Sequence, residues 1–477
     1  MTSRRMRLFA FDFLGPAHLS AGLWRHENDR GHRYTDLRYW TDYARLLEEA
    51  RFDGIFFADN AGYHDVYRSS VAEALADAAQ LPANDPSLVI SAMASVTDNL
   101  GFGVTASTSY EHPYALARRF TTLDHLTNGR IGWNLVNSYS DSAARNFGMG
   151  RQLPHDERYD RAAEYLEVTY KLWEASWEDD AVVRDRENCV WADPARVHEI
   201  HHHGRYFTVP GIAQCEPSPQ RTPVIFQAGG SPKGQQLAAA HAEVVFANAV
   251  SMAALKGQID TVRKLAAEAG RDPQSVKVLE MLNVVCAPTD EAARAKFESY
   301  RRLINPAGAM TRYSGWSGLD MSQLAPDVPL EHVKTRAGQT MVDLFSKMDP
   351  DKEWTPRDIA EFIGIGGSGP TIVGSPRTVA DELIRWMDVT GVDGFNIGHA
   401  VKYQDIADFI ELVVPELQRR GVMWTDYEGS TLREKLYGPG VIRLREDHPG
   451  RRFAHRPIPP HTREFQEAQP TAQGASL

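Results

Sequence analysis

The sequence predicts an α/β protein whose main domain is a (β/α)8 barrel of the TIM type. Short apolar runs, the form expected of strands buried on both faces, alternate along the chain with amphipathic helical segments. Eight of these strand–helix units can be identified, which is the number that closes a parallel barrel. Two long irregular segments, residues 177–220 and 306–370, interrupt the alternation without ending it.

The first units show the pattern most clearly. A strand is expected at residues 7–11 and a helix at residues 37–50, where apolar side chains recur every three or four positions after the candidate cap Asp36. The run GIFFA at residues 54–58 is apolar throughout, as in a strand covered on both faces. Further short apolar runs predict strands at residues 101–107, 130–136, 223–227, 244–248, 276–287 and 392–397. Further amphipathic segments predict helices at residues 85–99, 113–126, 155–173, 234–241, 251–270, 290–305, 379–390 and 403–419.

The two irregular segments are interpreted as insertions into one domain over residues 1–435, because strand–helix units resume after each of them. Residues 436–477, rich in Pro, Arg and His, are expected to form a C-terminal extension that docks on a neighbouring subunit. We accordingly expect a homo-oligomer, either a dimer or a tetramer.

The composition favours small-molecule chemistry. The chain has 52 Lys and Arg against 63 Asp and Glu, a net charge of −11, which argues against a nucleic-acid partner. No run approaches the roughly 20 apolar residues of a membrane span, and the short N-terminal run carries Asp12, unlike a signal peptide. We therefore expect a cytoplasmic enzyme. The three cysteines, too few for a disulfide framework or a metal site, are expected to be packing residues: Cys189, Cys215 and Cys286.

Two well-known motifs occur in contexts that do not suit them. The run at residues 364–369 matches G-x-G-x-x-G, but a helical segment precedes it and Pro370 follows, so a mobile glycine-rich loop over the site is expected. Residues 198–202 match the zinc motif H-E-x-x-H, but Pro194 and Gly204 flank them. A solvated hairpin is expected there, with a zinc enzyme as the lesser alternative, and no metal site is predicted.

Polar residues gather at the ends of the predicted strands and at the helix starts that follow them. The carboxyl ends of barrel strands form the face that carries the active site in this fold. The residues in question are Asp59, Thr105, Ser107, Asn134, His155, Tyr159, Gly230 and Ser231. His18 follows the first strand in the same way.

The segments around these residues resemble the bacterial-luciferase-like flavin monooxygenases, in the branch of the nitrilotriacetate and dibenzothiophene-sulfone monooxygenases. The similar segments include NDPSLVISAMASVTDNLGFGVTA, HDERYDRAAEYLEVTYKLWE and EPSPQRTPVIFQAGGSPKG, and the resemblance extends to about residue 435. Within this branch, the sequence is most similar to the large subunit of the dimethyl-sulfide monooxygenases.

The resemblance implies an enzyme that binds reduced FMN (FMNH2) supplied by a separate NAD(P)H:FMN reductase. Oxygen would add at the flavin C4a, and the resulting C4a-peroxyflavin would transfer one oxygen atom to the substrate. Carried over by position, the flavin contacts fall on Asp59, Thr105, His155, Tyr159 and Ser231, with Asn134 as a further contact. Ser107 and Gly230 complete the expected cofactor-binding set. His18 is the candidate catalytic residue on the substrate side.

Structural roles remain open for several of these residues. Asp59 could cap a turn, His155 could cap its helix, and an aromatic such as Tyr159 is often a core residue. Asn134 could be a packing polar group at a strand end, and His18 could be structural.

The expected substrate is a small organosulfur compound such as dimethyl sulfide, with cleavage of a C–S bond. Phe11, Phe57 and Trp316 are expected to line a small apolar pocket. The alternatives are the same chemistry on a sulfone, an aminocarboxylate or another xenobiotic, or a deazaflavin-dependent oxidoreductase. A non-catalytic barrel subunit is the remaining hypothesis, and the intact set of strand-end polar residues argues against it.

Overall fold

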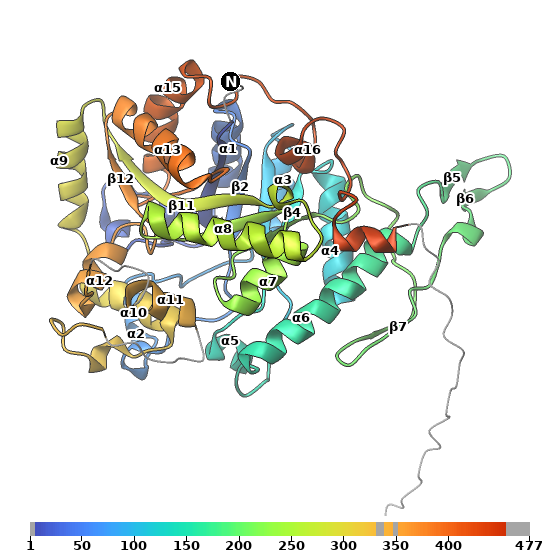
Figure 1. Ribbon diagram of the computed structural model, residues 1–477, viewed down its shortest axis with the longest axis horizontal. Helices are drawn as coiled ribbons and strands as arrows, with labels where there is room; N and C mark the ends of the chain where they lie inside the picture. Colours follow the sequence, from blue (N-terminus) through green and yellow to red (C-terminus); the bar gives the residue numbers. More distant parts are fainter. Residues whose placement is uncertain (1–4, 331–337, 347–351, 455–477) are drawn as a thin grey trace, which may run out of the picture.

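The computed structural model describes residues 5–330, 338–346 and 352–454, and it shows a closed barrel of parallel strands surrounded by helices (Figure 1). Eight strands follow one another around the barrel in the order β1-β2-β3-β4-β9-β10-β11-β13, and β13 pairs with β1 to close it. The predicted fold class is therefore confirmed. The residues of the C-terminal extension beyond 454 lie outside the described part of the chain.

The barrel strands lie where the apolar runs predicted them. Their bounds are β1 Arg7–Phe13, β2 Gly54–Ala58, β3 Gly101–Ser107, β4 Ile131–Val136, β9 Val224–Gln227, β10 Val244–Ala247, β11 Lys277–Cys286 and β13 Gly394–Gly398. The first strand is two residues longer than expected. A ninth strand, β12 (Thr371–Gly374), was not predicted and pairs with the end of β11 outside the barrel.

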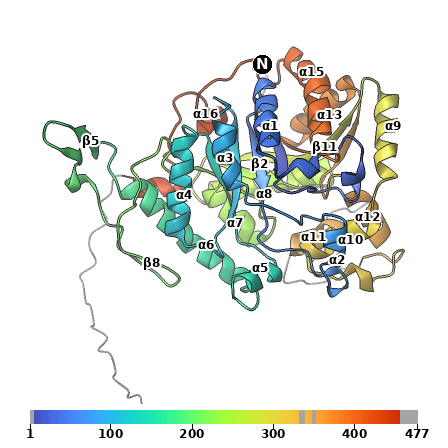
Figure 2. The same cartoon turned by 180° about the vertical axis from the view of Figure 1, so that it is seen from behind.

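Helices cover the outside of the barrel, and α1, α3 and α4 lie side by side when the molecule is seen from behind (Figure 2). The main helices are α1 Leu37–Glu49, α3 Ser87–Ala94, α4 Pro113–Leu126, α6 His155–Tyr170, α7 Pro232–His241, α8 Met252–Glu268, α9 Asp290–Arg301 and α13 Pro376–Thr390. None of the described helices combines the length and the apolar composition that a membrane-spanning segment needs.

The barrel interior is filled by a layer of aromatic side chains. The ring centroid of Phe246 lies 4.0 Å from that of Phe56 and 5.4 Å from that of Phe226. Gly132 makes room for this layer, because a Cβ atom there would lie 2.2 Å from the ring of Phe226. Side chains on the other face of the same strands pack against the helices, so each barrel strand is buried on both faces.

The short helix α16 (Leu432–Tyr437) closes the N-terminal end of the barrel. Leu432 and Leu436 pack against the interior aromatic layer. Between them, Arg433 forms an ion pair at 2.7 Å with Glu243, and both side chains are almost completely buried. This helix spans the predicted boundary between domain and extension at residue 435, and the division itself stays a prediction.

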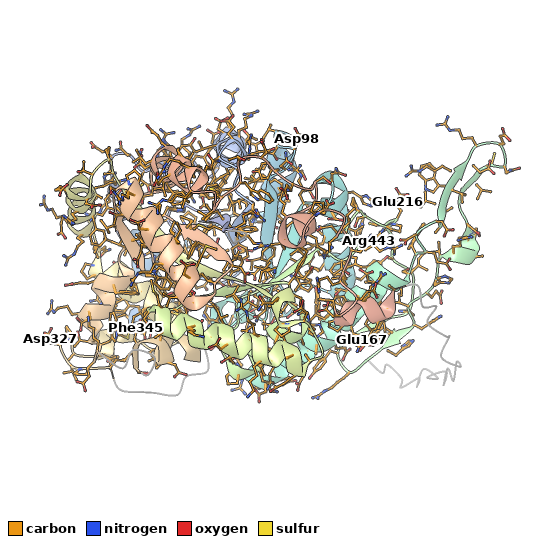
Figure 3. All side chains as sticks on the ribbon, turned by 45° about the horizontal axis from the view of Figure 1, so that its top comes forward. Asp98, Glu167, Glu216, Asp327, Phe345 and Arg443 are labelled. Carbon is orange, nitrogen blue, oxygen red and sulfur yellow. The ribbon has the colours of Figure 1, made fainter. Side chains whose placement is uncertain are left out.

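The two insertions differ in kind. The first carries two small hairpins: β5 (Val182–Asp185) with β6 (Val190–Ala192), which projects away from the barrel in Figure 1, and β7 (His202–His203) with β8 (Thr208–Val209). The second insertion was expected to be irregular, and this was wrong. It contains α10 (Pro306–Ser317), α11 (Gln339–Ser346) and α12 (Pro356–Ile363), which share a small core that includes Tyr313 and Phe345, the latter labelled in Figure 3.

We predict that Arg433→Ala lowers the free energy of unfolding by about 3–5 kcal/mol, because it leaves the carboxylate of Glu243 buried without its partner. Urea unfolding of the full chain measures this change. The matched control is Arg45→Ala, which removes an exposed pair with Asp42 and is expected to lower that free energy by less than about 1 kcal/mol. Equal midpoint shifts in the two variants would contradict the prediction.

Candidate active site

Two predicted cofactor residues lie side by side on neighbouring strands. Thr105 on β3 is in register with Asn134 on β4, and the Asn134 amide donates a hydrogen bond of 2.8 Å to Oγ1 of Thr105. That hydroxyl in turn donates to the carbonyl of Phe57 at 2.7 Å. The amide oxygen of Asn134 is buried and has no partner among the described residues. An unpartnered buried acceptor costs free energy, so it points to a ligand that donates a hydrogen bond here.

Three further predicted residues meet where two helices begin. Ser231 caps α7 through its side chain, and His155 is the first residue of α6. Oγ of Ser231 lies 3.2 Å from Nε2 of His155 and 3.3 Å from the hydroxyl of Tyr159. A Cβ atom at Gly234 would come within 2.8 Å of the Tyr159 hydroxyl, so the small residue permits this approach.

The meeting point of these helices has the features of an anion site. Helix N-termini carry partial positive charge and free N–H groups, and the His155, Tyr159 and Ser231 side chains add donors beside them. Gly230 precedes the cap residue in the same turn. A phosphate group fits this donor set, as expected for the phosphate of FMN.

Asp59 follows β2 and Ser107 ends β3, but among the described residues no side-chain hydrogen bond or ion pair joins either of them to the other predicted cofactor residues. Ser107 hydrogen-bonds with the hydroxyl of Ser138 at 2.8 Å and accepts from the backbone N–H of Ser109 at 3.1 Å. Burial, and next the charge of Asp85, raise the pKa of Asp59 to about 7.

His18 is buried after the end of β1, with 3% of its surface exposed. Its ring packs edge-on against Phe11 at 4.5 Å and stacks on Phe13 at 5.5 Å. Burial, and next the neighbouring His399, lower the pKa of His18 well below its ordinary value, so the ring is neutral at physiological pH. Its Nδ1 has no partner among the described residues.

His399 is a candidate site residue that the sequence analysis missed. It directly follows β13, is 4% exposed, and its ring centroid lies 6.4 Å from that of His18. Neither ring nitrogen has a hydrogen-bond partner among the described residues, although Nε2 lies 4.0 Å from a carboxylate oxygen of Asp12. Its position after the last predicted strand was the signal available, because that strand end reaches the same barrel face as the others.

The structure corrects one of the three predicted pocket residues. Phe11 lies in the barrel interior as expected, with its ring 5.6 Å from that of Phe56. Phe57 instead faces the helix layer, where its ring lies 5.4 Å from that of Trp40. Successive side chains of a strand alternate between its faces, so Phe56 takes the interior position that was assigned to Phe57.

Trp316, the third predicted pocket residue, lies near the end of α10. Its ring centroid is 6.4 Å from that of His64, whose Nε2 is 3.0 Å from Oε1 of Gln80. The buried Arg312, one turn earlier in α10, pairs with Asp77 at 2.6 Å and donates to the carbonyl of His18 at 3.4 Å. This helix is therefore fixed beside the loop that carries His18.

The glycine-rich run at residues 364–369 lies at the strand ends and is tied to them. The backbone N–H of Gly366 donates to Oγ of Ser20, and its carbonyl accepts from the amide of Asn283 at 2.8 Å. Asn248, after β10, donates to Oγ of Ser368. The run precedes the strand β12 and follows the helix α12, the reverse of the order in a dinucleotide-binding motif. Its function as a lid stays a prediction.

The H-E-x-x-H segment forms part of the predicted hairpin but is not fully solvated. His202, in β7, is 4% exposed; its Nε2 lies 3.3 Å from Oε1 of Glu164 and its Nδ1 lies 3.1 Å from Nζ of Lys171. No three His, Cys, Asp or Glu side chains of the described residues group as metal ligands would.

We predict that the contribution of Asp59 to the stability of the folded protein falls as the pH rises from about 4 to about 7. With its pKa raised, the folded carboxyl keeps a proton that the unfolded chain has already lost, so unfolding is favoured at higher pH. Asp59→Asn removes this titration. The unfolding temperature of the variant should therefore rise relative to that of the wild type as the pH increases. A difference between the two proteins that is constant from pH 4 to pH 8 would refute this role.

Comparison with known proteins shows the family to which the chain belongs. A model of the luciferase-like monooxygenase family matches residues 18–394. The chain is 48% identical over 450 residues to the dimethyl-sulfide monooxygenase of Hyphomicrobium sulfonivorans, covering 94% of each protein. It is 46% identical over 451 residues to the long-chain alkane monooxygenase of Geobacillus thermodenitrificans strain NG80-2, covering 94% of this chain and 98% of that protein.

The similarity extends to three-dimensional structure. The crystal structure of DmoA from Hyphomicrobium sulfonivorans matches with a TM-score of 0.88 at 48% identity, covering 94% of this chain and 96% of that one. The resemblance drawn from the sequence is confirmed, and this chain is an enzyme of the luciferase-like monooxygenase family.

Proposed function

We propose that this protein is the oxygenase of a two-component system, which receives reduced FMN from a separate reductase and inserts one oxygen atom of O2 into a small organosulfur substrate. The observation that carries the proposal is the meeting of His155, Tyr159 and Ser231 at two helix N-termini. The amide oxygen of Asn134, on β4, adds a buried acceptor that has no hydrogen-bond partner among the described residues.

These residues divide the recognition of FMN between its two ends. Ser231, His155 and Tyr159 would hold the phosphate, and the amide oxygen of Asn134 would accept from an N–H of the ring system. When bound, the reduced flavin supplies the activation of O2 and the oxygen atom that is transferred. The protein residues bind and orient the cofactor and exclude water from it.

The barrel interior favours a small, uncharged substrate. Phe11 and the aromatic layer below it, with Phe56 and Phe246, offer an apolar wall, and His18 is neutral beside them. Two buried cations near this end are held by carboxylates, and a third, Arg158, donates to the backbone carbonyl of Ser138. Arg312 pairs with Asp77 at 2.6 Å, and Lys402 pairs with Asp12 at 2.8 Å. Neither is available to bind a polyanionic substrate.

A dialkyl sulfide such as dimethyl sulfide meets these requirements. Transfer of oxygen to the carbon beside sulfur would give a hydroxylated intermediate that breaks down to a thiol and an aldehyde, whereas transfer to sulfur would give a sulfoxide. The 48% identity with the dimethyl-sulfide monooxygenase supports a dialkyl sulfide as the substrate. The chain is almost as similar to the long-chain alkane monooxygenase, at 46% identity. A long-chain alkane is therefore the alternative substrate to test beside the sulfide.

The decisive experiment supplies the purified protein with an FMN reductase, NADH and 18O2, together with dimethyl sulfide or a long-chain alkane. We predict a thiol and an aldehyde from the sulfide only when the reductase is present, because the glycine-rich run lacks the context of an NAD(P)H site. Mass spectrometry identifies the product. Stoichiometric oxidation of NADH by the protein alone would contradict the two-component assignment, and faster turnover of the alkane would contradict the substrate.

We predict that Asn134→Ala and Ser231→Ala each weaken the binding of reduced FMN by about 1–3 kcal/mol, the usual effect of losing one partner of a buried hydrogen bond. Anaerobic titration measures the affinity. Ser231→Thr keeps the hydroxyl and should restore binding, and the exposed Ser91→Ala on α3 is the control. Unchanged affinity in both alanine variants would show that the cofactor lies elsewhere.

We predict that Phe56→Leu raises the ratio of kcat/KM for dipropyl sulfide to that for dimethyl sulfide by about tenfold. The smaller side chain would leave room for additional methylene groups, and an apolar pocket distinguishes substrates that differ by such groups. The adjacent variant Phe57→Leu is a matched control, because it alters the helix layer and not the interior. It should reduce stability and leave the ratio unchanged. Equal ratios in both variants would count against an interior substrate pocket.

A further inference from the structure

A groove of about 390 Å³ lies at the N-terminal end of the barrel, opposite the candidate active site. Its walls come from the first residues of β1 and β11, from α16, and from the segments around Trp424 and Arg445. Its volume falls within the range of about 300–1,000 Å³ that small-molecule sites occupy. Nothing in the proposed oxygenase function uses this groove.

The groove is rich in positive charge. Five basic side chains line it: Arg5, Arg7, Lys277, Lys435 and Arg445. Three carboxylates share the lining, and two of them already have partners. Glu434 accepts hydrogen bonds from the backbone N–H groups of Thr431 and Gly440, both at 2.9 Å. Asp272 accepts a hydrogen bond from the backbone N–H of Gln274 and forms an ion pair with Arg445.

Lys435 lines the groove although only 1% of its surface is exposed. Its Nζ makes two long hydrogen bonds, of 3.3 and 3.4 Å, with the carbonyls of Ser430 and Thr431 and lies 5.6 Å from the ring centroid of Tyr427. It forms no ion pair with any described carboxylate. Burial lowers the pKa of Lys435 to about 8. A buried ammonium group without a counter-ion is unfavourable, and an anion in the groove would supply one.

Arg7 is a second cation in the groove, and it has a hydrogen-bond donor that has no partner among the described residues. Its Nη2 donates to the carbonyl of Leu436 at 2.7 Å, while its Nε is buried and has no partner in the described chain. Arg7 also lacks an ion pair with a described carboxylate. Arg5, by contrast, is fixed by Asp53 at 2.9 Å and lies over the ring of Trp424, so it forms a rigid wall beside the free groups.

We propose that this groove binds the phosphate group of a small phosphate monoester, with Arg7 and Lys435 as the principal ligands. A guanidinium fork suits the oxygens of a phosphate, and a buried ammonium adds a point charge. The groove is larger than a phosphate ion, which leaves room for the ester portion. The bound anion would join the start of β1 to α16 and so stabilise the floor of the barrel. This inference does not depend on the proposed oxygenase function.

The test is calorimetric titration and thermal unfolding of the full-length protein with glycerol 3-phosphate, inorganic phosphate and, at equal ionic strength, potassium chloride. We expect saturable binding at pH 7 and a rise in unfolding temperature with each phosphate ligand but not with chloride. At pH 9.5 Lys435 is neutral, so binding should weaken by about tenfold or more. Tighter binding of glycerol 3-phosphate supports an ester, whereas tighter binding of inorganic phosphate supports the same site but overturns the ester.

Variants separate this groove from the flavin site. Arg7→Gln and Lys435→Met should lose the response, while Lys264→Met, an exposed lysine on α8, should keep it. Ser231→Ala alters only the proposed FMN phosphate site, so it should keep the part of the response that Arg7→Gln removes. Arg7 is only partly buried, so its variant tests the inference even if Lys435→Met fails to fold. A response equal to that of chloride, or one that survives Arg7→Gln and is lost in Ser231→Ala, overturns the proposal.

Discussion

The alternation of side chains along eight parallel strands is the constraint on which the rest of the structure depends. One face of each strand packs into the aromatic interior and the other packs against the helices. This arrangement works because the interior aromatic layer is closely packed: Gly132, which has no side chain, leaves room for the ring of Phe226. The same alternation points Thr105 and Asn134 inward at the strand ends. A shift of one residue in either strand would turn its polar group into the helix layer.

The strands of the barrel could be predicted because each is a short apolar run between helical segments, and this signal is local. The second insertion could not be predicted in the same way. Its helices are short, and side chains such as Tyr313 and Phe345 pack mainly on one another, so their burial depends on contacts that a local pattern does not contain. β12 was missed because its four residues follow a glycine-rich run and pair only with the end of β11.

The site shows the same division between local and non-local information. His155 and Tyr159 lie one helical turn apart, and Ser231 precedes a helix, so sequence similarity was enough to select them. The choice of Phe57 over Phe56 was wrong because a strand that is apolar on both faces does not reveal which residues point inward. His399 meets His18 only because β13 pairs with β1, a contact between the two ends of the chain.

The position of α16 has a consequence for how the molecule is made. The helix that closes the barrel floor is encoded near the C-terminus, and the last barrel strand precedes it by only a short stretch of chain. During synthesis on the ribosome, the first strands therefore emerge long before their closing partner. Until then, apolar strand edges and the aromatic interior remain uncovered, which is the condition under which nascent chains aggregate or require chaperones. Because α16 follows all eight barrel strands in the chain, its synthesis is the step that completes the cover of the interior.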